Sequence, residues 1–382
     1  MPITLIATTF AGLEPVLATE LQQLGATNIK TLTRAISFDA DTYLLYATNM
    51  HLRTAIKILK PVLSFSASGE QELYDNAMQQ RWEDHLTIEK TFAIDFAVNS
   101  EFFHHSKYAS LKLKDAIADY FRNKYGVRPS VNPENPDVQF HMHIYHNTVN
   151  ISLDSSGESL HKRGYRDAMH KAPLNEVLAA GMISLSGWDR NSTFFDPMCG
   201  SGTLVIEAGM MAQNIAPCLI RKDYAFKKWD DYNDKLYKQI ILDAAANVQD
   251  KKIILTGSDI DGHSIDMAKK NAINAKLENK INFFVKPFHI SDPPNIPGMV
   301  IMNPPYGERL QNLDINTFYE GIGDVFKKKY DGYTAWILSA NKEAIKHIGL
   351  RTSQKITLFN GPLECKFLRY DLYAGSKKQK NQ

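Results

Sequence analysis

The chain has 382 residues, which is too long for one ordinary domain and predicts two or three. Its hydrophobic content of 44% is enough for packed cores, and no run approaches the ~20 apolar residues that a membrane span needs. The formal net charge of +2 excludes a uniformly basic protein, so any nucleic-acid contact has to come from a local patch.

The three cysteines, Cys199, Cys218 and Cys365, are odd in number and widely separated. Their spacing fits no zinc motif, and it is typical of a reducing compartment. The first residues lack the basic region and cleavage site of a signal peptide. We therefore expect a cytoplasmic protein without a bound metal and without a membrane partner.

Residues 1–42 are predicted to form a small α/β unit. An apolar strand over 3–7 precedes a helix over 13–24, whose apolar residues recur at helical spacing. Gly25 follows that helix as a usual C-terminal stop, and residues 35–38 alternate as a second strand.

Residues 43–155 are predicted to form a second unit. It contains a helix over 43–59 ended by Pro61, a strand over 91–98 and an amphipathic helix over 107–125. Two further strands, 138–145 and 148–153, form a hairpin around His146 and Asn147. His141 and His143 point to one side of the first of these strands. No third ligand is in view, so a surface pair is favoured over a metal site.

Two segments carry clustered positive charge and are predicted to contact RNA phosphates. The first is the helix over 107–125, where Asp115 and Asp119 partly neutralise the basic face, so a merely solvated helix is the alternative. The second is the stretch 160–166, for which contact with RNA or a role as a lid over a cofactor is favoured, and a polar strap between domains is the alternative. The predicted RNA-binding residues are Lys107, Lys112, Arg122, Lys124, Lys162, Arg163 and Arg166.

Residues 156–382 are predicted to form a third unit in which strands and helices alternate. This alternation is typical of a mostly parallel sheet with helices on both faces, closed here by two strands near the C-terminus that are predicted to be antiparallel. A polar, aromatic insertion over 217–250 interrupts the pattern, and the sequence assigns it no role. Residues from 377 onward are predicted to be a disordered basic tail.

The stretch 193–203 reads as a buried strand, an acidic end at Asp196, a glycine turn and the start of a helix. Gly200 and Gly202 allow positive φ and a close approach of the backbone to a ligand. The turn matches neither the phosphate loop G-x-x-x-x-G-K-[ST] nor the dinucleotide motif G-x-G-x-x-G. A tight structural turn without a ligand stays open as an alternative at this point.

Two more strand ends are predicted to meet this turn at the carboxyl edge of the sheet. One ends at Asp259, Ile260 and Asp261, where a carboxylate is placed to accept ribose hydroxyls and Ile260 to cover an adenine face. The other ends at the run Asn303-Pro304-Pro305-Tyr306.

The Asn-Pro-Pro-Tyr run suits an exocyclic amine on a flat base. The carbonyls of Asn303 and Pro304 can accept hydrogen bonds from both N–H groups of the amine, which favours a pyramidal nitrogen. The two prolines fix the backbone angle φ. Tyr306 offers a ring on which an unstacked base can lie. A rigid turn after a buried strand is the alternative interpretation.

With these motifs the chain resembles the class I S-adenosylmethionine-dependent methyltransferases of the Asn-Pro-Pro-Tyr type. More narrowly, it resembles the THUMP-domain methyltransferases that act on guanine N2 in large-subunit rRNA. The segments that carry the resemblance are 161–166, 196–203, 257–261 and 303–310. The resemblance implies an α/β fold: a doubly wound, mostly parallel, seven-stranded Rossmann-like domain over 156–382. It also implies a ferredoxin-like unit over 1–42 and a THUMP RNA-binding domain over 43–155.

The resemblance further implies a cofactor, S-adenosylmethionine (SAM), and a substrate, 23S rRNA or a large-subunit precursor. The residues implied to contact SAM are Asp196, Pro197, Cys199, Gly200, Ser201, Gly202, Thr203, Asp259, Ile260, Asp261, Phe288 and Asn303. Asn303, Pro304, Pro305 and Tyr306 are implied to hold the target base. Where the family has an acidic residue that reads the adenine amine, this chain has Val285-Lys286-Pro287-Phe288, so backbone groups near Phe288 are expected to take that role.

Three functions stay open from the sequence. Guanine-N2 methylation of 23S rRNA leads, as the resemblance implies. The N-terminal third counts against DNA, because it looks like an RNA-binding module and contains no obvious helix-turn-helix. Adenine-N6 methylation of DNA or RNA is the alternative with the same chemistry, since the motif accepts either amine. A non-catalytic RNA-binding assembly protein is the third, and the intact Asp196, Asp259 and Asn303 count against it.

Overall fold

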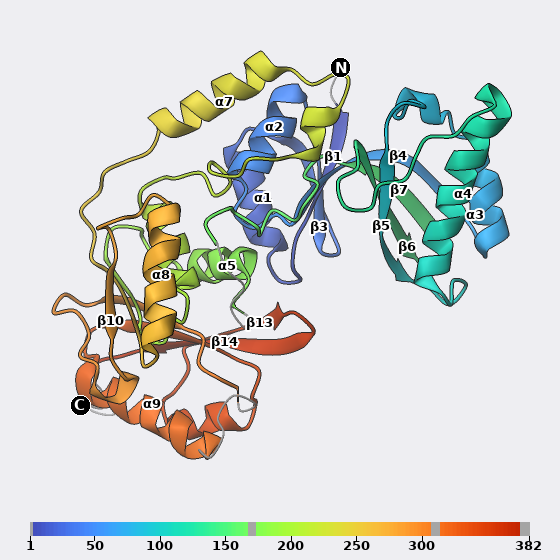
Figure 1. The fold of residues 1–382 in the computed structure, drawn as a ribbon. Helices are drawn as coiled ribbons and strands as arrows, with labels where there is room; N and C mark the ends of the chain where they lie inside the picture. The colour runs from blue at the N-terminus through green and yellow to red at the C-terminus, as the bar shows by residue number, and fades with distance from the viewer. Residues whose placement is uncertain (1–2, 167–172, 307–313, 375–382) are drawn as a thin grey trace.

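The structure is a computed structural model that describes residues 3–166, 173–306 and 314–374, and Figure 1 shows its course. Two seven-stranded sheets organise it, one from the N-terminal part of the chain and one from the C-terminal part. The predicted division into units at 42/43 and 155/156 stays a prediction.

The first sheet has the order β2-β3-β1-β4-β7-β6-β5, and only β5 and β6 run parallel. Its strands are β1 (Ile3–Thr8), β2 (Thr27–Leu32), β3 (Ala35–Ala40), β4 (Lys57–Ser66), β5 (Phe92–Asn99), β6 (Val138–Tyr145) and β7 (Thr148–Asp154). Its helices are α1 (Glu14–Gln23), α2 (Thr42–His51), α3 (Glu70–Met78), η1 (Trp82–Asp84) and α4 (Ser106–Tyr125). Because β4 pairs with both β1 and β7, one continuous sheet joins the two predicted N-terminal units.

The predicted helix over 43–59 is wrong in its second half. α2 ends at His51, and Pro61 lies inside β4 rather than after a helix. The pairing of β4 with β7 shifts register between Pro61 and Leu63, which is how a strand accommodates a residue without an N–H. The sequence analysis also missed β2, α3 and α7. The predicted hairpin is confirmed: β6 and β7 pair around His146, whose φ is +51°.

The second sheet has the order β10-β9-β8-β11-β12-β14-β13, parallel from β10 to β12 and antiparallel for the last two strands. Its strands are β8 (Thr193–Asp196), β9 (Leu255–Asp259), β10 (Asn282–Val285), β11 (Gly298–Met302), β12 (Thr334–Ser339), β13 (Gln354–Asn360) and β14 (Leu363–Asp371). Its helices are α5 (Glu176–Ser186), α6 (Thr203–Ala212), η2 (Ala225–Lys228), α7 (Asp234–Ala246), α8 (Gly262–Asn274), η3 (Phe288–Ile290), α9 (Ile315–Lys329) and η4 (Ala344–Ile348). The predicted doubly wound α/β class is confirmed.

This sheet has a separate apolar core on each face. One core joins α5 and α6 to Phe194, Ile301 and Trp336. The other joins α9 to Phe195, Val300 and Met302. Because successive residues of a strand point to opposite faces, the continuous apolar runs of β8 and β11 fill both cores, as expected of buried parallel strands.

The insertion over 217–250, which the sequence analysis left without a role, holds the units together. The ring of Phe226 stacks on Tyr46 of α2 with a centroid distance of 4.5 Å. The Arg221 guanidinium donates to the carbonyls of Ser156, Glu158 and Ser159. Lys228 Nζ donates to Asn135 Oδ1 at 2.6 Å, next to β6. These contacts attach the insertion to α2, to the residues before β6 and to the segment that follows β7. Among the described residues, no helix is long and apolar enough to cross a membrane.

Candidate active site

Three strand ends that carry the predicted site residues lie side by side in the second sheet. β8 lies between β9 and β11, so Asp196 has Asp259 as a neighbour on one side and the Asn303 segment on the other. The carboxyl edge at a switch in strand order is where ligands of such sheets bind. The structure therefore brings together the three motifs that are far apart in the sequence.

The glycine turn after β8 is held open by its neighbours. Gly200 and Gly202 have φ of +52° and +85°, and α6 begins directly afterwards, at Thr203. The Cys199 N–H donates to Ser258 O, and the Ser258 hydroxyl donates to Pro197 O. A Cβ at Gly200 would meet nothing within 4 Å, so the backbone borders free space. The turn has the conformation and the open side that a backbone-bound ligand needs.

Asp196 is a buried carboxyl without a cationic partner among the described residues. It is 2% exposed and accepts a hydrogen bond from the Met198 N–H. Burial raises its pKa well above the usual value, and the carboxylate of Asp259 adds to the rise. A group placed in this way is stabilised by a ligand that brings positive charge.

Asp259 and Asp261 shape the second strand end. Asp259 Oδ2 accepts from the Gly200 N–H at 2.9 Å, and Asp259 Oδ1 accepts from the Asp261 N–H at 3.0 Å. Asp261 is the N-cap of α8 and accepts from His263 N and Ser264 N. Ile260 stands 70% exposed beside them. Asp261 thus orders the helix start, while Asp259 and Ile260 border the turn.

Cys199 and Phe288 are placed less directly. Cys199 is buried, and its burial raises the pKa of the thiol well above the usual value, so the thiol stays protonated. Phe288 packs its ring against Phe326 and Tyr330 in the core beneath α9. Its carbonyl accepts from Ser291 N, and its own N–H has no backbone partner among the described residues.

Arg166 of the predicted RNA-binding stretch reaches the glycine turn instead of the surface. Nη2 donates to Thr203 Oγ1 at 2.6 Å, and Nη1 donates to Ser201 Oγ at 3.2 Å. Nε donates to the Glu176 carboxylate, and the side chain is 18% exposed. In this arrangement the guanidinium fixes the two hydroxyl side chains of the turn. No sequence signal separates this role from phosphate contact.

Arg163 corrects the sequence prediction, because it cannot contact RNA from where it lies. Its side chain is 0% exposed, pairs with Glu207 and donates to Leu160 O at 2.8 Å. It also donates to Arg53 O. Burial raises the pKa of Glu207, and the Arg163 guanidinium opposes that rise. Arg163 therefore ties the 160–166 stretch to α6 and to the segment that follows α2.

The Asn303-Pro304-Pro305-Tyr306 segment leaves β11 with its side chains already bonded. The Tyr306 hydroxyl donates to Asn303 Oδ1, the oxygen that the sequence analysis assigned to a substrate amine. Burial raises the pKa of Tyr306 above its usual value. Tyr306 thus occupies the acceptor on Asn303, and a bound amine has to replace its hydroxyl there.

A second layer, which the sequence analysis missed, holds this segment. Tyr319 of α9 donates to Pro305 O at 3.4 Å and shares a 2.7 Å hydrogen bond with Ser339. Asn341 Nδ2 donates to Tyr306 O at 3.3 Å. Ser339 ends β12, the neighbour of β11, so the same strand-end rule that located Asn303 would have located it.

The basic residues of α4 and Lys162 lie at the surface, though most have partners. Lys162 pairs with Glu158, Arg122 with Asp119 and Lys124 with Glu83. Lys112 lies over the rings of Tyr74 and Tyr108. Lys107 is exposed at the first turn of α4, and the described residues form no ion pair with it. Within the same described part, no group of three or more His, Cys, Asp or Glu could hold a metal ion.

The strand order and the glycine turn beside three polar strand ends are those of a doubly wound sheet with its ligand site at the carboxyl edge, as expected for the class I methyltransferases. Residues 163–369, more than half of the chain, match the family described as "RMKL-like, methyltransferase domain". The chain belongs to this family of SAM-dependent methyltransferases. Residues 67–154 match the THUMP domain, and residues 4–59 match the "RlmL ferredoxin-like domain".

Comparisons along the whole chain agree. The Synechocystis sp. PCC 6803 protein slr0064 is 38% identical over 96% of both chains. The ribosomal RNA large subunit methyltransferase K/L of Shewanella frigidimarina is also 38% identical, over 96% of this chain but 52% of its own length. The chain thus spans about half the length of the K/L relatives that it matches.

Solved structures share the fold over nearly the whole chain. A possible methylase from Clostridium difficile 630 superposes with a TM-score of 0.88 at 31% identity, covering 99% of this chain and 100% of that one. The crystal structure of SMU.472 in complex with SAH has a TM-score of 0.86 at 28% identity, covering 98% and 99%.

The residues present fit SAM as the cofactor. Gly200 borders open space where a Cβ would stand, as a backbone-bound cofactor requires. The buried Asp196, which has no cationic partner in the described part of the chain, suits the positive charges of SAM. Asp259 lies beside it at the next strand end, where a ribose would lie.

Proposed function

We propose that this protein methylates the exocyclic N2 amine of a guanosine in RNA, and that this RNA is 23S rRNA or a large-subunit precursor. The observation that carries the proposal is the position of Asn303-Pro304-Pro305-Tyr306 directly beside the glycine turn, on the neighbouring strand. A site for a planar amine therefore adjoins the site for the methyl donor.

The chain's own residues supply two effects in this proposal. SAM, when bound, supplies an electrophilic methyl group. The carbonyls of Asn303 and Pro304 accept hydrogen bonds from the two N–H groups of the amine. They thereby stabilise the positive charge that grows on nitrogen. Tyr319 and Asn341 hold the carbonyls of Pro305 and Tyr306, the next two residues, which fixes the backbone that follows the two acceptors. Asp196 and Asp259 hold and orient the cofactor, and Ile260 and the Phe288 N–H border its adenine.

The Tyr306 hydroxyl has a specific place in this proposal. It holds Asn303 Oδ1 in the free protein, which keeps the acceptor bonded and its side chain oriented. The entering base takes over that acceptor and leaves the Tyr306 ring to stack on the base. The acceptor is therefore preorganised before the substrate arrives.

RNA as the substrate is supported by the THUMP match and by the names of the K/L relatives. The choice of guanine N2 rests on the family resemblance, and the clamp by itself also accepts adenine N6 in RNA or DNA. A non-catalytic assembly protein is the weaker alternative, because Asp196, Asp259 and Asn303 meet at one sheet edge. A cytoplasmic location follows from the rRNA substrate and is part of the proposal.

The test treats unmodified 23S rRNA with enzyme and methyl-labelled SAM, then digests the RNA to nucleosides and identifies the labelled one. We expect N2-methylguanosine. Asn303→Ala should reduce turnover by about 10²–10³, because one preorganised group is removed from the transition state. SAM affinity, measured by calorimetry, should change little.

Each other outcome points to one part of the proposal. Label found only in N6-methyladenosine would overturn the guanine assignment and keep the fold. Full turnover by Asn303→Ala would overturn the role of the clamp. SAM binding without label in any nucleoside would favour the assembly protein.

A further inference from the structure

The turn of the β13–β14 hairpin stands at the same sheet edge as Asn303, and the proposed function gives it no role. β14 runs antiparallel to β12, and its residue Lys366 pairs with Ser339, the last residue of β12. The turn between the two hairpin strands follows at once, with Gly361 at a φ of +60°, a conformation that favours glycine. The hairpin turn therefore lies at the carboxyl edge, where the target base has to enter.

The side chain of Tyr306 connects the amine clamp to this hairpin. Its hydroxyl donates to Asn303 Oδ1 and accepts from the thiol of Cys365, whose Sγ lies 3.9 Å away. The same Sγ lies 3.6 Å from Leu363 O, so the single thiol proton can serve either oxygen. The Asn360 side chain also interacts with the Tyr306 hydroxyl. This hydroxyl thus has the substrate acceptor as one partner and two hairpin side chains as the others.

The surroundings keep both the phenol and the thiol protonated. Cys365 is 0% exposed, and Tyr306 packs against the same apolar core. Burial raises the pKa of the Tyr306 phenol and of the Cys365 thiol above their usual values. A buried hydroxyl that loses its acceptor is costly to leave unpaired. Tyr306 therefore needs a new acceptor whenever a base takes over Asn303 Oδ1.

The hairpin offers that acceptor without a movement of the main chain. The carbonyl of Tyr306 is held by Asn341 Nδ2 at 3.3 Å, so only the side chain is free to respond. The carboxamide of Asn360 carries an acceptor oxygen beside its donor nitrogen. The Cys365 sulfur becomes a weak acceptor once the thiol proton points to Leu363 O. A rotation of the Tyr306 hydroxyl proton toward the hairpin is then sufficient.

We propose that Asn360 and Cys365 are positioning residues for the target base: they receive the Tyr306 hydroxyl when the base takes over Asn303 Oδ1. The hydroxyl keeps its proton and changes only its acceptor. This inference rests on the proposed function, because it requires an amine at Asn303. It gives the last two strands of the sheet a part in the reaction.

The test measures kcat and KM for methylation of unmodified 23S rRNA by the full chain with methyl-labelled SAM. Asn360→Ala should lower kcat about tenfold, because the hydroxyl loses its main second acceptor when the base is in place. The KM for RNA and the affinity for SAM should stay unchanged, since neither depends on the step in which the base takes Asn303. Asn360→Asp keeps an acceptor and should recover most of kcat. Cys365→Ala should lower kcat only about two- to threefold, because a thiol is a weak partner.

A double-mutant cycle separates this role from a merely structural one. Tyr306→Phe has no hydroxyl to receive, so Asn360→Ala in that background should change kcat less than about twofold. A tenfold loss in that background as well would overturn the inference. The matched control is Thr357→Val, which removes a hydroxyl that bonds Lys366 within the same hairpin. It should leave kcat unchanged, and a loss equal to that of Asn360→Ala would reduce the effect to hairpin stability and overturn the inference.

The proposed function is judged separately in the same assay. Label in N2-methylguanosine without a loss of kcat in Asn360→Ala sinks the hairpin role alone. Label only in N6-methyladenosine, with the coupling between Asn360 and Tyr306 present, supports the hairpin role and sinks the guanine assignment. A wild-type protein that labels no nucleoside sinks both.

Discussion

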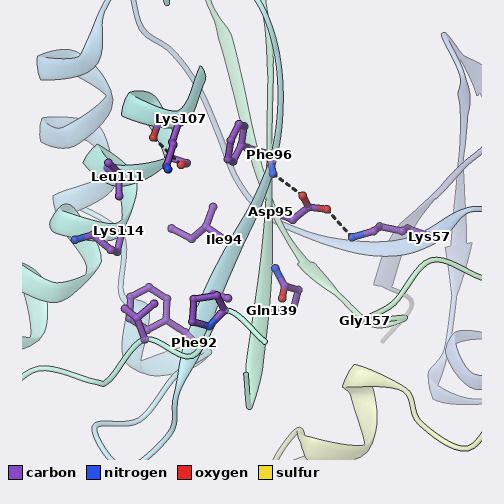
Figure 2. Close-up of a pocket in the computed structure, with 14 residues that line it drawn as sticks. Lys57, Phe92, Ile94, Asp95, Phe96, Lys107, Leu111, Lys114, Gln139 and Gly157 are labelled. Carbon is purple, nitrogen blue, oxygen red and sulfur yellow. Dashed lines mark hydrogen bonds and ion pairs between the residues drawn. The ribbon is translucent and has the colours of Figure 1, made fainter. Parts of the chain in front are cut away.

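The 160–166 stretch and helix α4 look alike in the sequence, since both are dense in Lys and Arg, yet the fold uses them in opposite ways. In the 160–166 stretch, Arg163 is buried against Glu207, and Arg166 holds Ser201 and Thr203 of the glycine turn. On α4, Lys107 and Lys114 border an open groove beside β5 (Figure 2). In the 160–166 stretch the positive charges hold the domains together and fix the glycine turn, whereas on α4 they face solvent.

The difference is where each segment lies relative to acidic partners. The 160–166 stretch passes between α6 and the segment that follows α2, and its acidic neighbours Glu176 and Glu207 are 4% and 0% exposed. A buried carboxylate needs a cation, so arginines next to it turn inward. α4 packs its apolar side against the sheet and α3, which leaves its lysines to water, aromatic rings or partly exposed carboxylates. Charge density in a sequence therefore does not by itself indicate a nucleic-acid surface.

The largest expected effect tests the buried side of this comparison. Arg163→Met should lower the free energy of unfolding by about 3–5 kcal/mol, because it leaves Glu207 buried without its partner. Denaturant unfolding measures this loss. Lys162→Met, one residue away and exposed, should cost less than about 1 kcal/mol. Equal costs for the two variants would contradict the buried role of Arg163.

The next effect concerns Arg166 and the cofactor. Arg166→Met should weaken SAM binding by roughly ten- to a hundredfold, because hydrogen bonds from a charged group are worth about 1.5–3 kcal/mol. Calorimetry measures SAM affinity, and RNA affinity should stay unchanged. Arg166→Lys should recover part of the loss. Combining Arg166→Met with Thr203→Val should cost less than the sum of the single changes, since both remove the same hydrogen bond. Additive losses, or a loss of RNA affinity alone, would return Arg166 to its predicted RNA role.

The third prediction uses the charge that surrounds His161. Burial lowers the pKa of His161 to about 4, and the positive charges of Arg163, Lys162, Arg166 and Arg221 add to the shift. Since the unfolded chain takes up a proton near pH 6.5 and the folded chain does not, stability is full above pH 6.5 and falls between pH 6.5 and 4. One proton limits the slope to about 1.4 kcal/mol per pH unit. His161→Gln should flatten this part of the profile, and an unchanged profile would contradict the prediction.

The smallest expected effect concerns the far end of α4. Arg122→Gln and Lys124→Gln should each weaken RNA binding by less than about fivefold, because Asp119 and Glu83 already pair with these cations at the surface. Anisotropy in low salt measures the effect most sensitively. A tenfold loss at either position would place a main RNA contact at this end of the helix.

The sequence by itself determined the local part of this protein. Alternating strands and helices from 193 onward predicted the doubly wound sheet, and the acidic and Asn-Pro-Pro-Tyr strand ends predicted which residues meet. The spacing of apolar residues indicates whether a segment is a strand or a helix, so the alternation can be predicted locally. Parallel strands present their carboxyl ends at one edge of the sheet, so the motifs at those ends are expected to meet. The strand order β9-β8-β11 then brings Asp259, Asp196 and Asn303 together.

Only the tertiary structure decided what depends on partners distant in the chain. Pro61 read as the end of a helix, but pairing with β1 and β7 drew its segment into a strand, which bulges at the proline. The role of the aromatic insertion depends on the stacking of Phe226 on Tyr46, which lies 180 residues earlier in the chain. Arg163 and Tyr306 found partners in Glu207 and Asn303, through contacts that no periodicity records. A side chain's burial and its bonded neighbour are properties of the packed fold, and they decide whether a charge faces RNA or the protein interior.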